Sequence, residues 1–207
     1  MRLRAGALMI TLCLLLSACG GGGTGGGPEQ RALEIRGDYL SMSSCGGSAE
    51  ITADYGQRVY DFGMTFTWAR DGELVITVTA PEEAAGVTAR LAEGETALEY
   101  DGVRLETGPL DPSGLSPVDA IPALLTAARE GFIAECGTET LGETEAIRLC
   151  CRDPDGQPGS GQEIQLWLDP AGGALLRGEI SVDGFTVIQC TFTGFSMELP
   201  AEDTITD

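Results

Sequence analysis

Hydrophobic and polar residues alternate along much of the chain, most clearly in the segment RVYDFGMTFTWAR. Side chains two residues apart in a β-strand point to the same face of the sheet. One face of this segment would be polar or small, and the other would be apolar. The apolar face would consist of Tyr60, Phe62, Met64, Phe66 and Trp68.

Further short alternating segments follow at a spacing of about eight to twelve residues, which is typical of an antiparallel meander. They include ELVITVTAP, TALEYDG, ETEAIRLCCR, QEIQLWLDP and GFTVIQCTFTGFSM. Asp71-Gly72 and Asp101-Gly102 are signals for tight hairpin turns between such strands. The pattern therefore predicts a mainly β domain in which consecutive strands pair.

A first helix is predicted from Glu29, in the segment EQRALEIRGDYLSMSSC. We expect it to end near Cys45, with Gly46-Gly47 as the stop signal. Its apolar positions are Leu33, Ile35, Tyr39, Leu40 and Met42.

A second helix is predicted midway through the strands, in LSPVDAIPALLTAAREGF. Ser116 is the expected N-cap, Pro117 fits the first helical position, and Gly131 is the expected stop. Pro122 should kink or restart this helix, because proline lacks the backbone N–H of a helix interior.

The N-terminus has the features of a secretory signal. Arg2 and Arg4 precede an apolar stretch of about ten residues, which is too short to span a bilayer. The sequence Leu-Ser-Ala-Cys ending at Cys19 resembles the lipobox of bacterial lipoproteins. This resemblance implies that Cys19 receives a diacylglyceryl group and becomes the first mature residue. An ordinary signal peptide with a chance cysteine is the alternative.

The composition along the chain predicts four segments. Residues 19–28 would form the lipidated cysteine and a glycine-rich tether, since glycines bury too little surface to become ordered. The signal peptide would comprise residues 1–18. Residues 29–199 would form one domain, and residues 200–207 would form an acidic tail.

The chain carries 32 acidic and 12 basic residues, a formal net charge of −20. Such a charge repels phosphate backbones and anionic lipid headgroups, so nucleic acid is excluded as a partner and charge cannot attach the chain to a membrane. Membrane attachment would depend on the N-terminal diacylglyceryl group.

The closing segment WLDPAGGALLRGEISVDGFTVIQCTFTGF resembles the end of the LolA-like superfamily of lipoprotein carriers and related lipoproteins. The first helix, the strands after it and the inserted helix also fit, so the resemblance spans roughly Glu29 to Leu199. One departure is Leu175-Leu176, where the family usually has a proline. The matching positions are Trp167, Asp169, Pro170, Arg177, Glu179, Ile180, the Asp183-Gly184 turn, Phe192 and Phe195.

The resemblance implies an α+β, mainly β fold: an unclosed antiparallel half-barrel with an N-terminal helix and one inserted helix over its concave face. It also implies binding of acyl chains or of a protein partner, without a cofactor. The apolar face of Tyr60 to Trp68 would then line a groove for a hydrophobic ligand, or would form plain core beneath the helices.

Catalytic chemistry finds little support in the composition. The chain has no histidine and no lysine, which removes the commonest general base and Schiff-base chemistry. Acidic pairs such as Glu82-Glu83 are typical of a solvated surface in so acidic a chain. Neither a zinc-type cysteine spacing nor the final glutamate of an EF-hand loop after Asp153 is present, so no metal site is predicted.

Five cysteines remain when Cys13 of the signal peptide and the lipidated Cys19 are set aside. An exported location permits disulfides, and an odd count leaves at least one cysteine unpaired. Cys150 and Cys151 should point to opposite faces of a strand. We expect one structural disulfide of unassigned connectivity, or buried thiols, among Cys45, Cys136, Cys151 and Cys190.

Three functions are consistent with the sequence. The first is a non-enzymatic lipoprotein of the cell envelope that binds a lipid or other hydrophobic ligand. The second is a regulatory or scaffolding lipoprotein that binds an envelope protein, and the third is an acidic hydrolase, which we place last. The anchor would lie on the outer face of the cytoplasmic membrane, or on the outer membrane facing the periplasm in a two-membrane cell.

Overall fold

The computed structural model describes residues 26–92, 95–108 and 113–200. The expected signal peptide, Cys19, most of the tether and residues 201–207 of the acidic tail lie outside the described residues. Within the described part, no helix is both long enough and apolar enough to cross a membrane.

Two helices and eleven strands make up the described chain. The helices are α1 (Pro28–Ser41) and α2 (Pro117–Glu130). The strands before α2 are β1 (Ser44–Asp54), β2 (Val59–Ala69), β3 (Leu74–Ala80), β4 (Thr88–Ala92), β5 (Glu95–Tyr100) and β6 (Val103–Glu106). The strands after it are β7 (Ile133–Leu141), β8 (Thr144–Arg152), β9 (Gln162–Leu168), β10 (Leu175–Val182) and β11 (Phe185–Glu198).

All strands belong to one antiparallel sheet in the order β6-β5-β4-β3-β2-β1-β11-β10-β9-β8-β7. Strands that are neighbours in sequence pair with each other, except β6 and β7, which are separated by α2, and the first strand also pairs with the last at the centre of the sheet. The two edges, β6 and β7, do not meet, so the sheet stays open. The predicted fold class, a mainly β half-barrel with two helices, is therefore confirmed.

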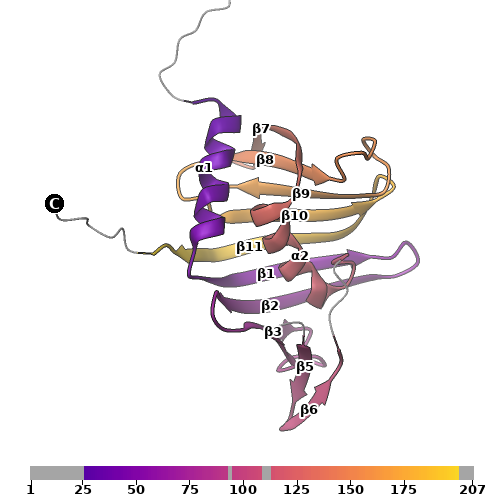
Figure 1. Cartoon of the computed structure of the whole chain (residues 1–207). Helices are drawn as coiled ribbons and strands as arrows, with labels where there is room; N and C mark the ends of the chain where they lie inside the picture. The colour runs from indigo at the N-terminus through magenta and orange to yellow at the C-terminus, as the bar shows by residue number, and fades with distance from the viewer. Residues whose placement is uncertain (1–25, 93–94, 109–112, 201–207) are drawn as a thin grey trace, which may run out of the picture.

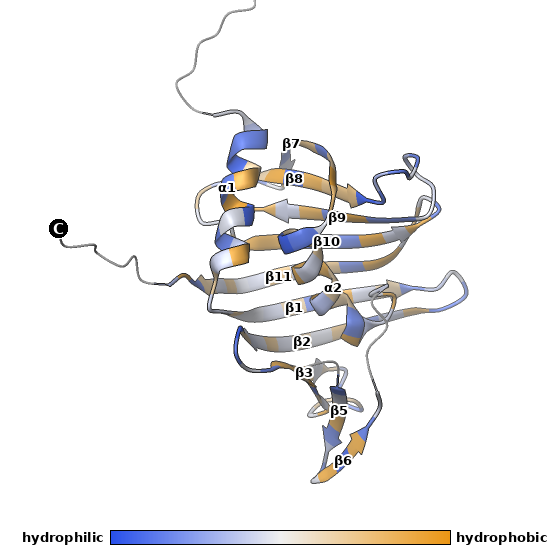
Figure 2. Cartoon of the chain, in the orientation of Figure 1, coloured by the Kyte–Doolittle hydropathy of each residue, from blue (hydrophilic) through white to orange (hydrophobic). Residues whose placement is uncertain are grey.

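Both helices lie on the same face of the sheet (Figure 1). The core forms between them and the inner faces of the strands, and the alternation predicted for β2 is observed, because Met64 and Phe66 are buried while Thr65 and Thr67 are exposed. Figure 2 shows this alternation of apolar and polar segments along the strands. At Gly178 in β10, an added Cβ would lie 2.6 Å from the side chain of Leu124, so glycine lets α2 approach the sheet closely.

Helix α1 differs from the prediction at both ends. It begins at Pro28, one residue earlier than expected, because proline suits the first helical position. It ends at Ser41 rather than near Cys45, and Gly46-Gly47 lie in β1 instead of stopping a helix. A Cβ at Gly46 would lie 2.9 Å from the carbonyl oxygen of Phe66, so the glycine serves close strand packing there.

Helix α2 agrees closely with its predicted signals. Ser116 is the N-cap, Pro117 is the first helical residue, and Gly131 is the C-cap. Pro122 does not restart the helix, which continues through it as a single element.

Candidate functional site

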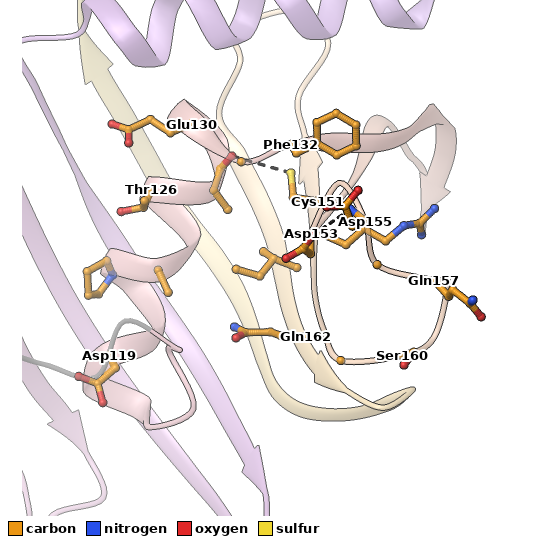
Figure 3. Close-up of a pocket in the computed structure, with 18 residues that line it drawn as sticks. Asp119, Thr126, Glu130, Phe132, Cys151, Asp153, Asp155, Gln157, Ser160 and Gln162 are labelled. Atoms are coloured by element: carbon orange, nitrogen blue, oxygen red, sulfur yellow. Dashed lines mark hydrogen bonds between the residues drawn. The ribbon is translucent and has the colours of Figure 1, made fainter.

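A cleft of about 1210 Å³ lies between α2, the end of β8 and the loop 153–161 that leads into β9 (Figure 3). This volume exceeds the range of roughly 300–1,000 Å³ that is common for small-molecule sites. Its apolar lining comes from Pro122, Ala123, Ala127, Phe132, Cys151 and Ile164. Its polar lining includes Asp119, Thr126, Glu130, Asp153, Asp155, Gln157, Ser160 and Gln162.

The N-terminal end of α2 is fixed by its cap. Ser116 Oγ accepts a hydrogen bond from the backbone N–H of Asp119 at 3.2 Å, and its hydroxyl donates to the Asp119 carboxylate. A carboxylate in the first turn is favoured by the helix dipole. Gln162 of β9 donates from Nε2 to the carbonyl oxygen of Ser113, which joins this end of α2 to the opposite wall.

The C-terminal end of α2 is held by both neighbouring elements. Arg36 of α1 donates from Nε to the carbonyl oxygen of Ala128 at 3.2 Å, so a cation lies at the negative end of the helix dipole. The Cys151 thiol contacts the carbonyl oxygen of Ala127 at 3.8 Å. A Cβ at Gly131 would lie 2.7 Å from that same oxygen, so only glycine allows the chain to leave the helix here.

The loop opposite α2 is held by hydrogen bonds at both ends. Asp153 Oδ1 accepts from the backbone N–H of Asp155 at 2.8 Å, which forms a tight turn after β8. At the other end, Asp183 Oδ1 accepts from the backbone N–H of Gly161 at 2.8 Å. Glu163 accepts from the N–H of Gly159 at 3.1 Å. Hydrogen bonds therefore hold both walls of the cleft, α2 and the loop, in place.

The cleft carries negative charge. Asp119, Glu130, Asp153 and Asp155 contribute carboxylates, and Arg152 is the single basic residue among the described residues that line it. The Arg152 guanidinium lies 2.9 Å from Glu135 and 3.0 Å from Glu163, so its charge is offset outside the cleft.

The groups that line the cleft are suited to binding rather than to nucleophilic chemistry. Burial raises the pKa of the Cys151 thiol above its usual value, an effect that outweighs the lowering by Arg36, so the thiol stays protonated near neutral pH. Within the described ranges, no three His, Cys, Asp or Glu side chains are grouped to hold a metal ion.

The five residues expected to line a groove lie elsewhere, and none of them lines the cleft. Met64 and Phe66 are core residues, and the Phe66 ring contacts Phe192 at a centroid distance of 6.0 Å. Phe62 and Trp68 are half-buried against this core. Tyr60 is exposed and lies beside Tyr55.

The expected disulfide is not formed, because Cys45, Cys136, Cys150, Cys151 and Cys190 are all free thiols. Four are buried and Cys136 is half-buried. Cys150 and Cys151 do point to opposite faces: Cys151 contacts α2, whereas Cys150 lies near Arg152 on the outer face. Cys151 and Cys190 therefore serve as small apolar side chains of the interior.

Because these thiols are buried, we expect the protein to lose stability at alkaline pH. Burial raises the pKa of Cys190 to about 12 and that of Cys45 to about 12. The unfolded chain loses these protons first, so the free energy of unfolding should fall as pH rises from about 9 towards 12. Urea unfolding across this range measures the slope, and Cys190→Ala should make it shallower. An equal slope in the variant would contradict a buried protonated thiol.

Sequence reasoning missed the cleft although it noticed parts of its walls. Gly131 was expected as a helix stop, and the loop after Asp153 was considered as an EF-hand loop. Ala123, Ala127 and Ile164 carry no signal beyond ordinary apolar periodicity. Their convergence depends on how α2 crosses the sheet, which no local pattern encodes.

No protein-family model matches the sequence, and no curated protein is detectably similar to it. Among solved structures, a conserved uncharacterised protein from Thermus thermophilus superposes with a TM-score of 0.51 at 12% identity, covering 84% of this chain and 90% of that one. A LolA superfamily protein from Nitrosomonas europaea gives a TM-score of 0.42 at 10% identity, with 88% and 98% coverage. The lipoprotein LppX from Mycobacterium tuberculosis gives 0.40 at 16% identity, with 81% and 92% coverage. The similarity to the Thermus protein supports the fold.

Proposed function

We propose that this protein is a lipid-anchored lipoprotein of the cell envelope that binds a hydrophobic ligand in the cleft beside α2. The observation that carries the proposal is the size of the cleft together with its apolar lining. Sites for apolar ligands are concave, largely preformed and mostly hydrophobic, with a few polar groups at defined positions. The capped helix and the hydrogen-bonded loop supply such a preformed site.

The charge of the cleft narrows the class of ligand. Carboxylates from Asp119, Glu130, Asp153 and Asp155 surround the apolar lining, and the charge of Arg152 is offset by its two glutamate partners. A ligand with an anionic head would be repelled there. The cleft therefore suits a neutral or cationic hydrophobic molecule better than a free fatty acid.

The proposed location rests on the sequence. The Leu-Ser-Ala-Cys motif ending at Cys19 supports lipid modification, and the glycines after it would let the domain reach a few nanometres from its anchor. The outer face of the cytoplasmic membrane is the proposed site of anchoring, with the outer membrane as the alternative in a two-membrane cell.

Filling the cleft should abolish ligand binding. Thr126 lines the cleft and is exposed on α2, so Thr126→Trp places an indole in the opening without disturbing the core. Binding of the neutral probe N-phenyl-1-naphthylamine, followed by its fluorescence, should weaken by about tenfold or more, because roughly 1.4 kcal/mol of lost binding already gives that factor.

The matched control is Thr65→Trp, an exposed threonine in β2 that does not line the cleft. It adds the same indole to the protein surface and should leave probe affinity unchanged. Equal affinity in both variants and the wild type would mean that the cleft is not the binding site. Absence of probe binding by the wild type would overturn the ligand-binding proposal and favour a protein partner.

A further inference from the structure

The β5–β6 hairpin forms one end of the sheet and projects beyond both helices (Figure 1). Its inner face continues a row of apolar side chains that begins in the core. The row runs across the pairs Phe66–Ile76, Ile76–Ala89, Ala89–Leu98 and Leu98–Leu105. Exposure is 2% at Phe66 and 2% at Ala89 but 61% at Leu105. The core pattern thus reaches the edge of the sheet, where the described residues leave Leu105 largely exposed.

A neighbouring row on the same face ends in the same way. Tyr100 and Val103 pair across the hairpin and are 53% and 68% exposed. Figure 2 shows apolar segments on both strands of this hairpin. Exposed apolar side chains on an edge strand favour pairing with another strand, unless charge prevents it.

The tight turn at Asp101-Gly102 decides which backbone groups of β6 are free. In a two-residue hairpin the residues that flank the turn form a hydrogen-bonded pair, so Val103 and Leu105 direct their N–H and C=O groups towards β5. The bond from the N–H of Thr107 to the carbonyl oxygen of Thr96, at 2.9 Å, continues this pattern. Arg104 and Glu106 therefore direct their backbone groups outwards, and no described residue hydrogen-bonds to them there.

The outer face of the hairpin carries alternating charge. A chain of ion pairs crosses the strands from Glu73 through Arg90, Glu99 and Arg104 to Glu106. Glu106 ends the chain at the edge, and its side chain is more than half exposed. Arg104 lies next to it on the same face, so the edge presents one positive and one negative group.

We propose that β6 is the contact surface for a second copy of this chain, which pairs with it antiparallel about a two-fold axis at Leu105. In this register Arg104 lies opposite Glu106 of the other copy, and Glu106 lies opposite its Arg104. Both pairs use the outward backbone groups, which gives four hydrogen bonds between the copies. Leu105 then lies opposite its own counterpart, and Val103 lies opposite Thr107.

Charge selects this register over its neighbours. Centring the axis on Arg104 would place two arginines opposite each other, and centring it on Glu106 would place two glutamates together. Like charges directly opposite each other destabilise a strand pair, whereas opposite charges and apolar pairs stabilise it. An antiparallel pair of identical strands is also self-complementary, as a two-fold interface requires. The interface does not depend on the cleft or on its ligand.

Cysteine cross-linking tests both the contact and its register. Leu105→Cys would place the two cysteines in a non-hydrogen-bonded pair with Cα atoms about 4.5 Å apart, within the range that a disulfide spans. Mild oxidation of the full chain in detergent should give a covalent dimer on non-reducing gels. Val103→Cys is the matched control: its two copies would be separated by four residues, about 13 Å, which is too far.

The dimer yield should be at least about tenfold higher for Leu105→Cys than for Val103→Cys or the wild type, because a disulfide cannot join cysteines whose Cα atoms lie more than about 7 Å apart. In the Leu105→Cys background, Arg104→Glu should lower the yield, and adding Glu106→Arg should restore it by exchanging the charges. Equal yields at the two positions, no dimer at Leu105→Cys, or capture of a different protein at that position would each overturn the proposal.

Discussion

Replacing Cys19 with serine should move the protein from the detergent phase to the aqueous phase in a phase-separation assay. A serine offers no thiol for a thioether-linked diacylglycerol, so the mature chain would lose both acyl chains. Each buried methylene of such a chain contributes about 0.8 kcal/mol to membrane binding, and two chains give stable anchoring. The strongly acidic domain cannot replace that attraction, because anionic headgroups repel it. Metabolic labelling with palmitate, followed by the intact mass, measures the modification directly.

Cys13→Ser provides the matched control, since it removes a cysteine from the apolar stretch of the signal and leaves the Leu-Ser-Ala-Cys motif intact. It should keep the label and the mass of a lipidated chain that begins at Cys19. The mass readout also separates an unlipidated mature chain from an uncleaved one, which could stay on the membrane through its signal. A Cys19→Ser chain that still carries the label would contradict the anchoring proposal.

Local signals in the sequence predicted the Asp101-Gly102 turn and the caps of α2. The prediction of a tight turn at Asp71-Gly72 was wrong in detail, because these residues lie within a longer connection between Ala69 of β2 and Leu74 of β3. At Asp101-Gly102 and Asp183-Gly184 both central residues have positive φ, as a tight hairpin between twisted strands requires. Glycine adopts such angles without strain, and aspartate tolerates them better than most residues. The Ser116 cap follows equally from chemistry within four residues. Where the deciding interaction is local, the sequence was sufficient.

Glycine was misleading where the deciding interaction was distant. Gly46-Gly47 resemble a helix stop when read alone, yet they lie in β1 between β2 and β11. Gly47 lies beside the backbone of Phe195, at an irregularity of strand pairing between Gly46 and Ser48. The reason for these glycines is a partner strand about 150 residues later, which local helix rules do not include.

The candidate site was the least predictable part. An alternating row such as Phe62 to Trp68 identifies an inner face but does not say whether helices seal it or leave it open. In the structure the helices and the rings of Phe192 and Phe195 seal its centre, and the opening lies on the far side of α2. Likewise, the count of cysteines permitted a disulfide, but the pairing of thiols depends on distances that only the fold sets.

Phe66→Ala should be among the most destabilising single substitutions in the domain. The Phe66 ring is fully buried and contacts the rings of Phe192 and Phe195 at centroid distances of 6.0 and 6.1 Å. Removing a core phenylalanine costs about 3–5 kcal/mol, because the transfer free energy of the ring is lost and a cavity remains. The free energy of unfolding from urea titration should fall by that amount.

Phe185→Ala makes the same chemical change at an exposed phenylalanine of β11 and should alter stability by no more than about 0.5 kcal/mol. Probe affinity separates the two roles that the apolar face of β2 could have. If Phe66 is core and the cleft beside α2 binds the ligand, the folded Phe66→Ala protein should bind N-phenyl-1-naphthylamine as the wild type does. A small loss of stability combined with a large loss of probe affinity would instead place the ligand against β2, because a side chain that lines an open groove stabilises the ligand more than the fold.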